Sequence, residues 1–275
     1  MPDVIVIGAG PAGLSAALTL RSRGKSVLLL ESPGAVSALA KAEKVDNYPG
    51  LPEIGGKALL EAMREQALSL GVEFLSEKAL AVLPMGDRFY VSAGQETLEA
   101  RSLILAAGAA RGKTLPGEEA LLGMGVSYCA TCDGMLYRGK NVAVLGFSAD
   151  AEEEAEFLRS IGCNLRFFSA EESKKARILG ENRVEGIELY GETLPFDGVF
   201  VLRDTVAPQA LLPGLELQGV HIAVQADMRT SVSGVFAAGD CVGTPYQIAK
   251  AVGEGNIAAL SAAKYLDQKA KEKIN

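Results

Sequence analysis

The chain has 275 residues, 48% of them hydrophobic, which is enough for two domains that each bury a core. Its formal net charge is -7 and it has no basic cluster, which argues against nucleic-acid binding because that binding must neutralise phosphates. No apolar run reaches the length of a bilayer span and no basic leader precedes the first apolar segment, so we expect no membrane association and a cytoplasmic location. Four cysteines, two of them close together, do not make the framework of a secreted disulfide-rich protein.

The N-terminal segment has the pattern of a nucleotide-binding strand, turn and helix. It predicts strands over 4–7 and 27–30 and a helix over 14–23, with the turn Gly8-Ala9-Gly10-Pro11-Ala12-Gly13 after the first strand. In such a turn the first glycine permits the tight bend, the second lets backbone N–H groups approach a pyrophosphate, and the third lets the helix pack on the strand. Glu31, at the end of the second strand, is placed to bind ribose hydroxyls. The predicted cofactor-binding residues here are Gly8, Gly10, Pro11, Ala12, Gly13 and Glu31, and a plain strand-to-helix turn is the alternative.

The next stretch predicts one helix and several short strands. Apolar residues at helical spacing cover 56–70, and strands are expected at 72–75, 79–83, 89–92 and 103–105, which favours a small antiparallel layer over a parallel sheet. The last of these strands is followed by small residues that permit a second close approach of backbone to a cofactor. Ala107 and Gly108 therefore join the predicted binding residues.

A dithiol motif, Cys129-Ala130-Thr131-Cys132-Asp133, lies between two strand-turn-helix patterns. Two thiols at this spacing can close a small disulfide ring reversibly, so we predict Cys129 and Cys132 to be redox-active. A zinc site would need further ligands, and the remaining candidates Cys163, Cys241 and His221 are solitary, so no metal is predicted. Cys163 and Cys241 are expected to be packing residues, and Cys241 directly follows Asp240.

Proton transfer at the dithiol is assigned to a carboxylic acid. His221, the only histidine, lies in a strand-like segment where a surface or strand-edge role is the simpler interpretation. Asp133 directly follows Cys132, and partial burial would raise its pKa into a useful range. The alternative for Asp133 is an acid that only complements a helix start.

A second strand-turn-helix pattern follows the dithiol but lacks the middle glycine. After a strand over 141–145 the turn reads Gly146-Phe147-Ser148, so a side chain occupies the place where backbone and pyrophosphate would meet. The first turns of the next helix carry four glutamates that oppose an anionic ligand: Glu152, Glu153, Glu154 and Glu156. NADPH is therefore disfavoured as the direct electron donor.

Near the C-terminus, a short strand delivers Gly239 and Asp240 to a turn, and a helix rich in small residues starts at about Gln247. The Asp240 carboxylate can accept hydrogen bonds from the ribityl chain of a flavin. This turn indicates that the dinucleotide is FAD.

The order of these motifs resembles the low-molecular-weight thioredoxin reductase family over nearly the whole chain. The resemblance implies an α/β protein of two Rossmann-like domains, the second inserted in the first. Non-covalent FAD is expected in the domain formed by residues 1–112 and 227–275, and the dithiol in the inserted domain, 113–226. The crossings near Arg111 and Asp227 are expected to act as hinges.

The resemblance also implies roles for single residues. Cys132 is the thiol facing the flavin, Cys129 the thiol that attacks the partner disulfide, and Asp133 the proton donor. Asn47 and Gln247 match family positions near the isoalloxazine ring, and Ile248 is assigned to the cofactor with them. The expected partner is thioredoxin or a thioredoxin-like protein, and relatives are usually homodimers.

The chain departs from the NADPH-using members of that family after the strand over 164–168. Those relatives carry a histidine-arginine cluster for the 2′-phosphate, whereas this chain has Ser169-Ala170-Glu171-Glu172-Ser173. This departure, and above all the segments 39–50 and 246–256, resemble the ferredoxin-dependent flavin thioredoxin reductases, which implies ferredoxin as the electron donor. A local docking patch for an acidic donor is expected to include Lys41, Lys44 and Lys250, with ordinary solvated lysines as the alternative.

Four other interpretations stay open. The chain could use NAD(P)H through a divergent site, or it could hold a second FAD there, stacked on Phe147. It could be a flavin-dependent dithiol oxidase that passes electrons to oxygen. It could also be a flavin-binding redox sensor without turnover.

Overall fold

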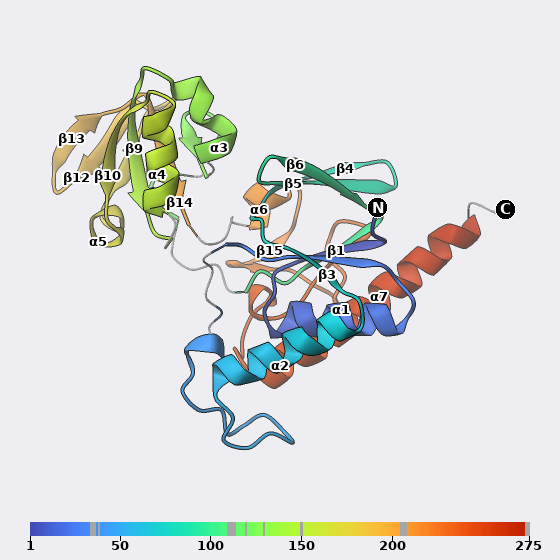
Figure 1. Ribbon diagram of the computed structural model, residues 1–275. Coiled ribbons are helices and arrows are strands. Elements are labelled where there is room, and N and C mark those ends of the chain that lie inside the picture. The colour runs from blue at the N-terminus through green and yellow to red at the C-terminus, as the bar shows by residue number, and fades with distance from the viewer. Residues whose placement is uncertain are drawn as a thin grey trace. The chain divides into compact units, whose positions relative to one another are not determined.

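The computed structural model describes residues 1–33, 37, 39–108, 114–118, 120–128, 130–148, 151–203 and 208–272, without the side chain of Cys132 (Figure 1). Cys129 and the predicted crossing at 111–113 lie outside the described residues. The chain divides into two compact units: Met1–Ala110 with Ala207–Asn275, and Arg111–Val206. The second unit is thus an insertion in the first.

The first unit is built on a five-stranded parallel sheet with the order β17-β7-β1-β2-β3. Its strands are β17 (Val235–Ala237), β7 (Ser102–Leu105), β1 (Val4–Ile7), β2 (Val27–Leu30) and β3 (Glu73–Leu75). The N-terminal strand lies at the centre, with Ile5 opposite Leu28 on one side and Leu103 on the other. All four residues of β1 are buried because both faces of the sheet are covered.

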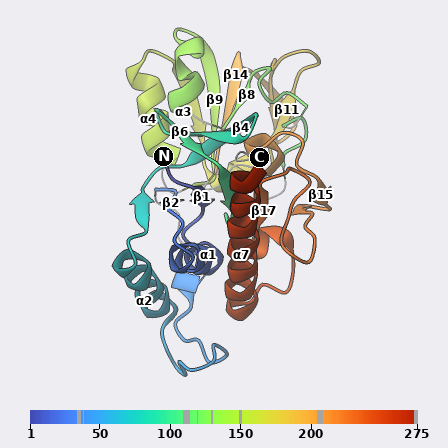
Figure 2. The same ribbon diagram turned by 90° about the vertical axis from the view of Figure 1, so that its right-hand side faces the viewer.

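Three helices cover one face of this sheet. They are α1 (Pro11–Ser22), α2 (Gly56–Ser69) and α7 (Ile248–Glu272), and α1 lies between the other two (Figure 2). Alanines and glycines on α1 and α7 let the two helices approach closely. A Cβ built on Gly255 would lie 2.1 Å from the Ala12 carbonyl oxygen, so only glycine fits there.

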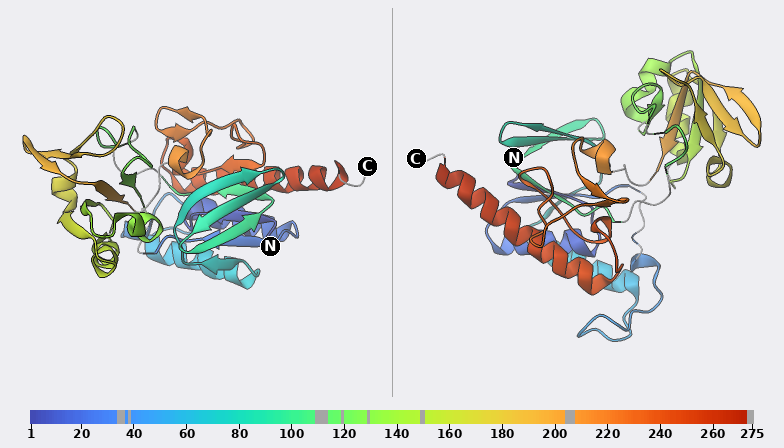
Figure 3. Two further views of the ribbon diagram at one scale, coloured as in Figure 1. Left: turned by 90° about the horizontal axis from the view of Figure 1, so that it is seen from above. Right: turned by 180° about the vertical axis from the view of Figure 1, so that it is seen from behind.

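A small antiparallel sheet covers the opposite face (Figure 3). It consists of β4 (Ala79–Met85), β5 (Arg88–Ala93) and β6 (Glu96–Ala100). The predicted antiparallel layer is therefore present, but its membership was partly wrong. The predicted strands at 72–75 and 103–105 belong to the parallel sheet as β3 and β7, and the third antiparallel strand is β6. The mostly polar sequence of β6 hides it, because its first residues face solvent.

The remainder of the first unit lies late in the chain. It comprises α6 (Pro208–Leu211), the hairpin of β15 (Leu217–Gln218) and β16 (His221–Ile222), and the 3-10 turn η3 (Asp240–Val242). A further 3-10 turn, η1 (Leu39–Lys41), lies early in the chain, before α2. The return to the first unit was predicted near Asp227, but it occurs at Ala207. Hydrogen bonds explain the correction: the Glu216 N–H donates to Ser231 Oγ at 2.9 Å and the Gln225 N–H to the Arg229 oxygen at 2.9 Å.

The second unit repeats the parallel plan on a smaller scale. Its sheet has the order β10-β9-β14-β8, formed by β10 (Asn164–Phe168), β9 (Asn141–Gly146), β14 (Gly198–Leu202) and β8 (Val126–Ser127). The helical segments are α3 (Ala130–Asp133), η2 (Gly134–Tyr137), α4 (Ala151–Ser160) and α5 (Ala170–Ser173). Antiparallel strands β11 (Arg177–Leu179), β12 (Gly186–Leu189) and β13 (Glu192–Pro195) complete it. Alternate residues of β9 enter two separate core clusters, so both faces of this sheet are packed.

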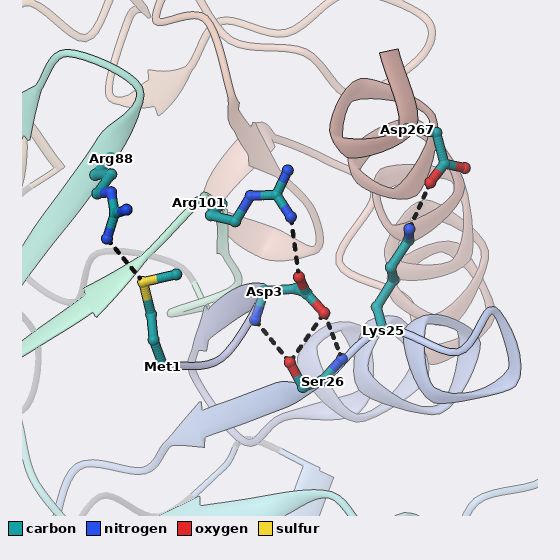
Figure 4. A network of polar contacts seen from close by, with 7 residues as sticks. All are labelled: Met1, Asp3, Lys25, Ser26, Arg88, Arg101 and Asp267. Atoms are coloured by element: carbon teal, nitrogen blue, oxygen red, sulfur yellow. Dashed lines mark hydrogen bonds and ion pairs between the residues drawn. The ribbon is translucent and has the colours of Figure 1, made fainter. Parts of the chain in front are cut away.

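A polar network ties together the starts of three strands in the first unit (Figure 4). The Ser26 hydroxyl and N–H donate to Asp3 Oδ2 at 2.9 Å, and Arg101 Nη1 donates to Asp3 Oδ1 at 3.4 Å. Burial alone would raise the pKa of Asp3, but the Ser26 hydrogen bonds and the charges of Arg101 and Lys25 outweigh it and lower that pKa. These residues precede β1, β2 and β7, so the network fixes the amino-terminal ends of these strands. The carboxyl-terminal ends of the strands, which form the carboxyl edge of the sheet, stay available for ligands.

The close approach of α7 to α1 can be tested with two glycines on one helix. Gly255→Ala places a Cβ against the Ala12 backbone and should lower the free energy of unfolding by about 1–3 kcal/mol. Gly253→Ala meets no atom within 4 Å and should raise it by about 0.5–1 kcal/mol through helix propensity. Urea denaturation of both variants measures the two changes, and a loss of similar size in both would contradict the packing argument.

Candidate functional site

The turn between β1 and α1 has two glycines that packing requires. Gly8 has a φ of +114°, and a Cβ there would lie 2.3 Å from the Ala106 oxygen. A Cβ on Gly13 would lie 1.8 Å from the Gly8 oxygen. The Gly8 N–H donates to the Leu30 oxygen at 2.9 Å, which ties the turn to the end of β2. The first and third glycines thus act as predicted, by letting the turn, helix and strands approach.

Gly10 differs from them because nothing in the protein crowds it. It is the N-cap of α1 in an extended conformation, and a Cβ built on it meets no atom within 4 Å. Pro11 follows at the first helical position, where its missing N–H costs nothing. The N–H groups of Ala12 and Gly13 are the first donors of the helix, as a bound pyrophosphate requires. Space at Gly10 combined with these donors fits a dinucleotide.

Glu31 directly follows β2 and is oriented by an arginine that the sequence did not reveal. Arg64 Nη1, on α2, donates to Glu31 Oε2 at 2.6 Å, and the Arg64 guanidinium lies 4.3 Å from the centre of the Phe74 ring. The Glu31 N–H donates to the Leu75 oxygen at 3.0 Å. The carboxylate is about one-third exposed, which leaves its second oxygen able to accept a ribose hydroxyl.

Two predicted residues from opposite ends of the chain meet in the first unit. Asn47 Nδ2 donates to Gln247 Oε1 at 2.8 Å, although the two are separated by 200 residues. Ile248 and Tyr48 pack against a buried cluster of Leu39, Val45 and Leu59 beside them. The segment around Asn47 is thereby fixed to the start of α7.

The Asp240 turn lies at the end of β17, beside the end of β7. The Ala238 N–H donates to the Leu105 oxygen at 3.0 Å, and the Ala106 N–H to the Ile7 oxygen at 2.8 Å. Gly108 has a φ of +76° and open space around it. Asp240 is partly buried, and this burial raises its pKa while the Lys250 charge partly offsets the rise. Ala107, Gly108, Gly239 and Asp240 therefore lie at the same carboxyl edge as the glycine turn.

Lys250 is not part of an exposed docking patch, contrary to the prediction. Its Nζ donates to the Gly239 oxygen at 2.9 Å and lies 3.1 Å from Glu254 Oε2, so its charge is used inside the unit. Lys44 is about half exposed and pairs with Glu53 at 2.8 Å and Asp46 at 3.2 Å. Of the three predicted lysines, Lys41 and Lys44 stay on the surface.

Cys163, Cys241 and His221 have structural roles. Cys241 Sγ donates to the Ala238 oxygen at 3.2 Å, and burial raises its pKa to about 12, so the thiol stays protonated. Cys163 is buried beside the Gly134 oxygen at 3.6 Å, and burial also raises its pKa. His221 Nε2 lies 2.8 Å from the Tyr246 hydroxyl at the edge of a two-residue strand.

In the second unit, the backbone of the dithiol segment is held against α4. Ala130 is fully buried, and its N–H donates to Glu154 Oε2 at 3.2 Å. A Cβ on Gly134 would lie 2.8 Å from Leu158 Cδ2, so this segment also lies close to α4. Asp133 is partly buried, as predicted, and its charge adds to the main effect of burial in raising the pKa of Tyr137.

The second glycine turn uses its donors within the protein. The N–H groups of Phe147 and Ser148 both donate to the Leu202 oxygen, at 2.8 and 3.1 Å. The Arg203 guanidinium lies 4.7 Å from the centre of the Phe147 ring and also pairs with Glu118. Glu118 is fully buried and accepts the Leu115 N–H at 2.7 Å. These contacts tie the turn to the end of β14 and place a guanidinium against the Phe147 ring.

The segment after β10 forms a helix cap. The Ser169 hydroxyl and N–H donate to Glu172 Oε2 at 2.7 and 2.9 Å, and Glu171 pairs with Lys174. The segment predicted to lack the cations of the NADPH-using relatives thus presents two glutamates, Glu171 and Glu172, at the start of α5.

Within the described ranges, no three histidine, cysteine or acidic side chains are grouped to hold a metal ion. In the same residues, no helix is long and apolar enough to span a bilayer.

Comparisons with known proteins agree with this geometry. The family model described as pyridine nucleotide-disulphide oxidoreductase matches residues 2–182 and 171–255. The thioredoxin reductase of Aquifex aeolicus is 37% identical over 307 residues, covering 98% of this chain and 94% of that protein.

Two crystal structures of a ferredoxin-flavin thioredoxin reductase from Clostridium acetobutylicum are also similar. The first is 42% identical with a TM-score of 0.90, covering 100% of this chain and 99% of that one. The second is 37% identical with a TM-score of 0.86, covering 97% and 98%. These likenesses confirm the predicted pair of Rossmann-like domains.

The open space at Gly10 leads to a test of the FAD site. Gly10→Ala adds a methyl group where it meets no protein atom, so the free energy of unfolding of the FAD-free protein should stay within about 1 kcal/mol of wild type. The same methyl group should obstruct the pyrophosphate and weaken FAD binding at least about tenfold. Flavin fluorescence on dilution of the holoprotein measures the affinity, and unchanged affinity would contradict the assignment.

Proposed function

Because this chain belongs to the pyridine nucleotide-disulphide oxidoreductase family and is a flavin-dependent enzyme of the thioredoxin reductase type, we propose its substrate and electron donor as follows. It reduces the disulfide of thioredoxin or a thioredoxin-like protein through Cys129 and Cys132. Its electrons come from ferredoxin rather than from NADPH. We further propose that it acts as a cytoplasmic homodimer.

The first unit supplies the FAD site in this proposal. The α1 N-terminus and Gly10 hold the pyrophosphate, Glu31 holds the ribose, and Asp240 accepts hydrogen bonds from the ribityl chain. Ala107, Gly108, Asn47, Gln247 and Ile248 contribute the remaining cofactor contacts. Bound FAD supplies a redox centre that can pass an electron pair to a disulfide.

The dithiol carries out the exchange with the partner. The Cys129 thiolate attacks the partner disulfide, forms a mixed disulfide and releases one partner thiolate, which takes up a proton. Cys132 then attacks Cys129 of the mixed disulfide, which frees the second partner thiol and leaves a Cys129–Cys132 disulfide. Restoring the dithiol then takes an electron pair and two protons, which bound FAD and the surrounding acid would have to supply. Asp133 holds the proton that these steps exchange.

One observation favours a donor other than NADPH. The Phe147 and Ser148 N–H groups both donate to the Leu202 oxygen, and Ser148 stands where the middle glycine would let a phosphate approach the backbone. The following helix starts with three glutamates, Glu152, Glu153 and Glu154, which would repel that phosphate. The likeness to two ferredoxin-flavin thioredoxin reductases supports ferredoxin as the replacement.

The alternatives receive less support. A second FAD stacked on Phe147 would compete with the Arg203 guanidinium, which already lies over that ring. A divergent NAD(P)H site would have to accommodate the Ser148 side chain where a phosphate approaches the backbone. No contact of the described residues favours a dithiol oxidase or a redox sensor over a reductase.

The surface beside the dithiol supports a protein substrate. Met135 and Leu136, which follow the motif after Gly134, are 58% and 68% exposed. Neighbouring exposed apolar side chains are typical of a protein-binding surface. A thioredoxin-like partner must bring its disulfide to this segment.

Anaerobic titration of the purified protein tests the donor and the substrate together. Reduced ferredoxin should bleach the flavin absorbance and support reduction of thioredoxin, whereas NADPH and NADH should do neither, because Ser148 and the glutamates of α4 disfavour their phosphates. Bleaching by NADPH at a comparable rate would contradict the donor assignment.

The same preparation separates the alternatives. One flavin per chain is expected, and a ratio close to two would favour the second FAD. Fast oxygen consumption with a dithiol would favour the oxidase, and no turnover with any donor would favour the sensor. Replacing both thiols, Cys129→Ser with Cys132→Ser, should abolish thioredoxin reduction without loss of bound FAD.

A further inference from the structure

An ion pair on α7 lies directly beneath the Asp240 turn. Lys250 and Glu254 are one helical turn apart, with Lys250 Nζ 3.1 Å from Glu254 Oε2. Each side chain is only 17% exposed. The pair is therefore not an ordinary surface ion pair, which would contribute little to stability.

Both members of the pair bind the backbone of the turn. Lys250 Nζ donates to the Gly239 oxygen at 2.9 Å and to the Gly243 oxygen at 2.5 Å. Glu254 Oε2 accepts the Gly239 N–H at 2.9 Å. Three backbone groups on the two sides of Asp240 are thus held by two charges from one helix. Hydrogen bonds to charged groups are about twice as strong as neutral ones.

The turn needs such support because its backbone is unusual. Gly239 has a φ of +88° and Gly243 a φ of +124°, so the segment between them is flanked by conformations that few residues adopt. The 3-10 turn η3 between them is too short to hold Asp240 in place by itself. Backbone groups bound to Lys250 and Glu254 fix both ends of it.

The same helix also contacts the pyrophosphate turn. On α7, a Cβ on Gly255 would lie 2.1 Å from the Ala12 oxygen. The Asp240 turn lies at the same place, because a Cβ on Gly239 would lie 2.8 Å from Ala12 Cβ. Ser15 Oγ, one turn into α1, donates to the Val252 oxygen at 2.7 Å. The ion pair is therefore built into the surface where α7 meets the glycine turn of α1.

We propose that Lys250 and Glu254 are positioning residues that hold the Gly239–Asp240 turn in its FAD-binding conformation before FAD binds. The proposal rests on FAD as the cofactor of the proposed function. Because the pair fixes the turn in advance, FAD binding does not have to supply the free energy of ordering it. The pair thereby raises the affinity for FAD without touching the cofactor. Lys250 also offsets the effect of burial on the Asp240 carboxylate, which favours the ionised acceptor.

A double-mutant cycle on FAD affinity tests this proposal. The variants are Lys250→Met, Glu254→Gln and the two combined, each prepared as the holoprotein and diluted while the fluorescence of released FAD is followed. Each single change should raise the Kd for FAD at least about tenfold, because the remaining charge no longer holds the turn. The combined change should raise the Kd for FAD no more than the more damaging single change does, because both changes disrupt one interaction.

A second ion pair on the same helix is the matched control. Lys269 and Glu272 are 2.7 Å apart, but their side chains are 41% and 63% exposed and lie far along α7 from the turn. Lys269→Met and Glu272→Gln should leave the Kd for FAD within about twofold of wild type. An equal effect of both pairs would show that helix charge, rather than the turn, is being measured.

The contradicting outcomes are separable from failure of the proposed function. If the Kd for FAD is unchanged in both single variants, or if their effects add, the proposal is wrong even where thioredoxin reduction is intact. A loss of apoprotein stability without any change in the Kd gives a purely structural role and also overturns it. If Lys250→Met does not fold, Glu254→Gln decides the matter, since it removes the charge that pairs with Lys250 and weakens the hydrogen bond from the Gly239 N–H. A wild-type protein that binds FAD but reduces no thioredoxin refutes the proposed function alone.

Discussion

One crowded contact determines how the two ends of the chain meet. The Ala12 carbonyl oxygen lies 2.1 Å from the place where a Cβ on Gly255 would be, so α7 can approach the glycine turn only because residue 255 has no side chain. This approach brings Gln247 beside Asn47 and the Asp240 turn beside Ala12. The predicted cofactor site, which combines the glycine turn with the Asp240 turn, forms only if α1 and α7 pack together. Packing of the two chain ends and formation of the cofactor site are thus coupled in the first unit, even though its sequence is interrupted by the second unit.

The second unit has kept the architecture of a nucleotide-binding module while using its donors for other contacts. Its parallel sheet and α4 are intact, but the N–H groups of the turn bind Leu202, and Phe147 is covered by Arg203. What α4 still does is hold the dithiol segment, through the Glu154 carboxylate and the close approach at Gly134. The core clusters on both faces of its sheet, rather than the turn, stabilise this unit.

Local patterns in the sequence were sufficient for the parts of the site that depend on neighbours in the chain. The glycine turn, the strand that delivers Asp240 and the altered turn at Gly146 each follow from a few consecutive residues. Contacts between distant segments were not accessible in this way. The Arg64–Glu31 pair and the return of the chain at Ala207 depend on packing that no local pattern encodes. Lys250 was misassigned for the same reason, although the spacing of Lys250 and Glu254 on one helix face was a readable signal. Where Cys129 lies relative to the flavin site stays a prediction.

The central claim is that electrons pass from FAD to thioredoxin only through the dithiol. Rapid mixing of the fully reduced holoprotein with oxidised thioredoxin, in the absence of oxygen, tests it most directly. The flavin absorbance should return as about two thioredoxin disulfides are reduced per flavin, one by the FAD electrons and one by the dithiol electrons. In Cys132→Ser the flavin should stay bleached. Return of the absorbance in that variant at the wild-type rate would contradict the account.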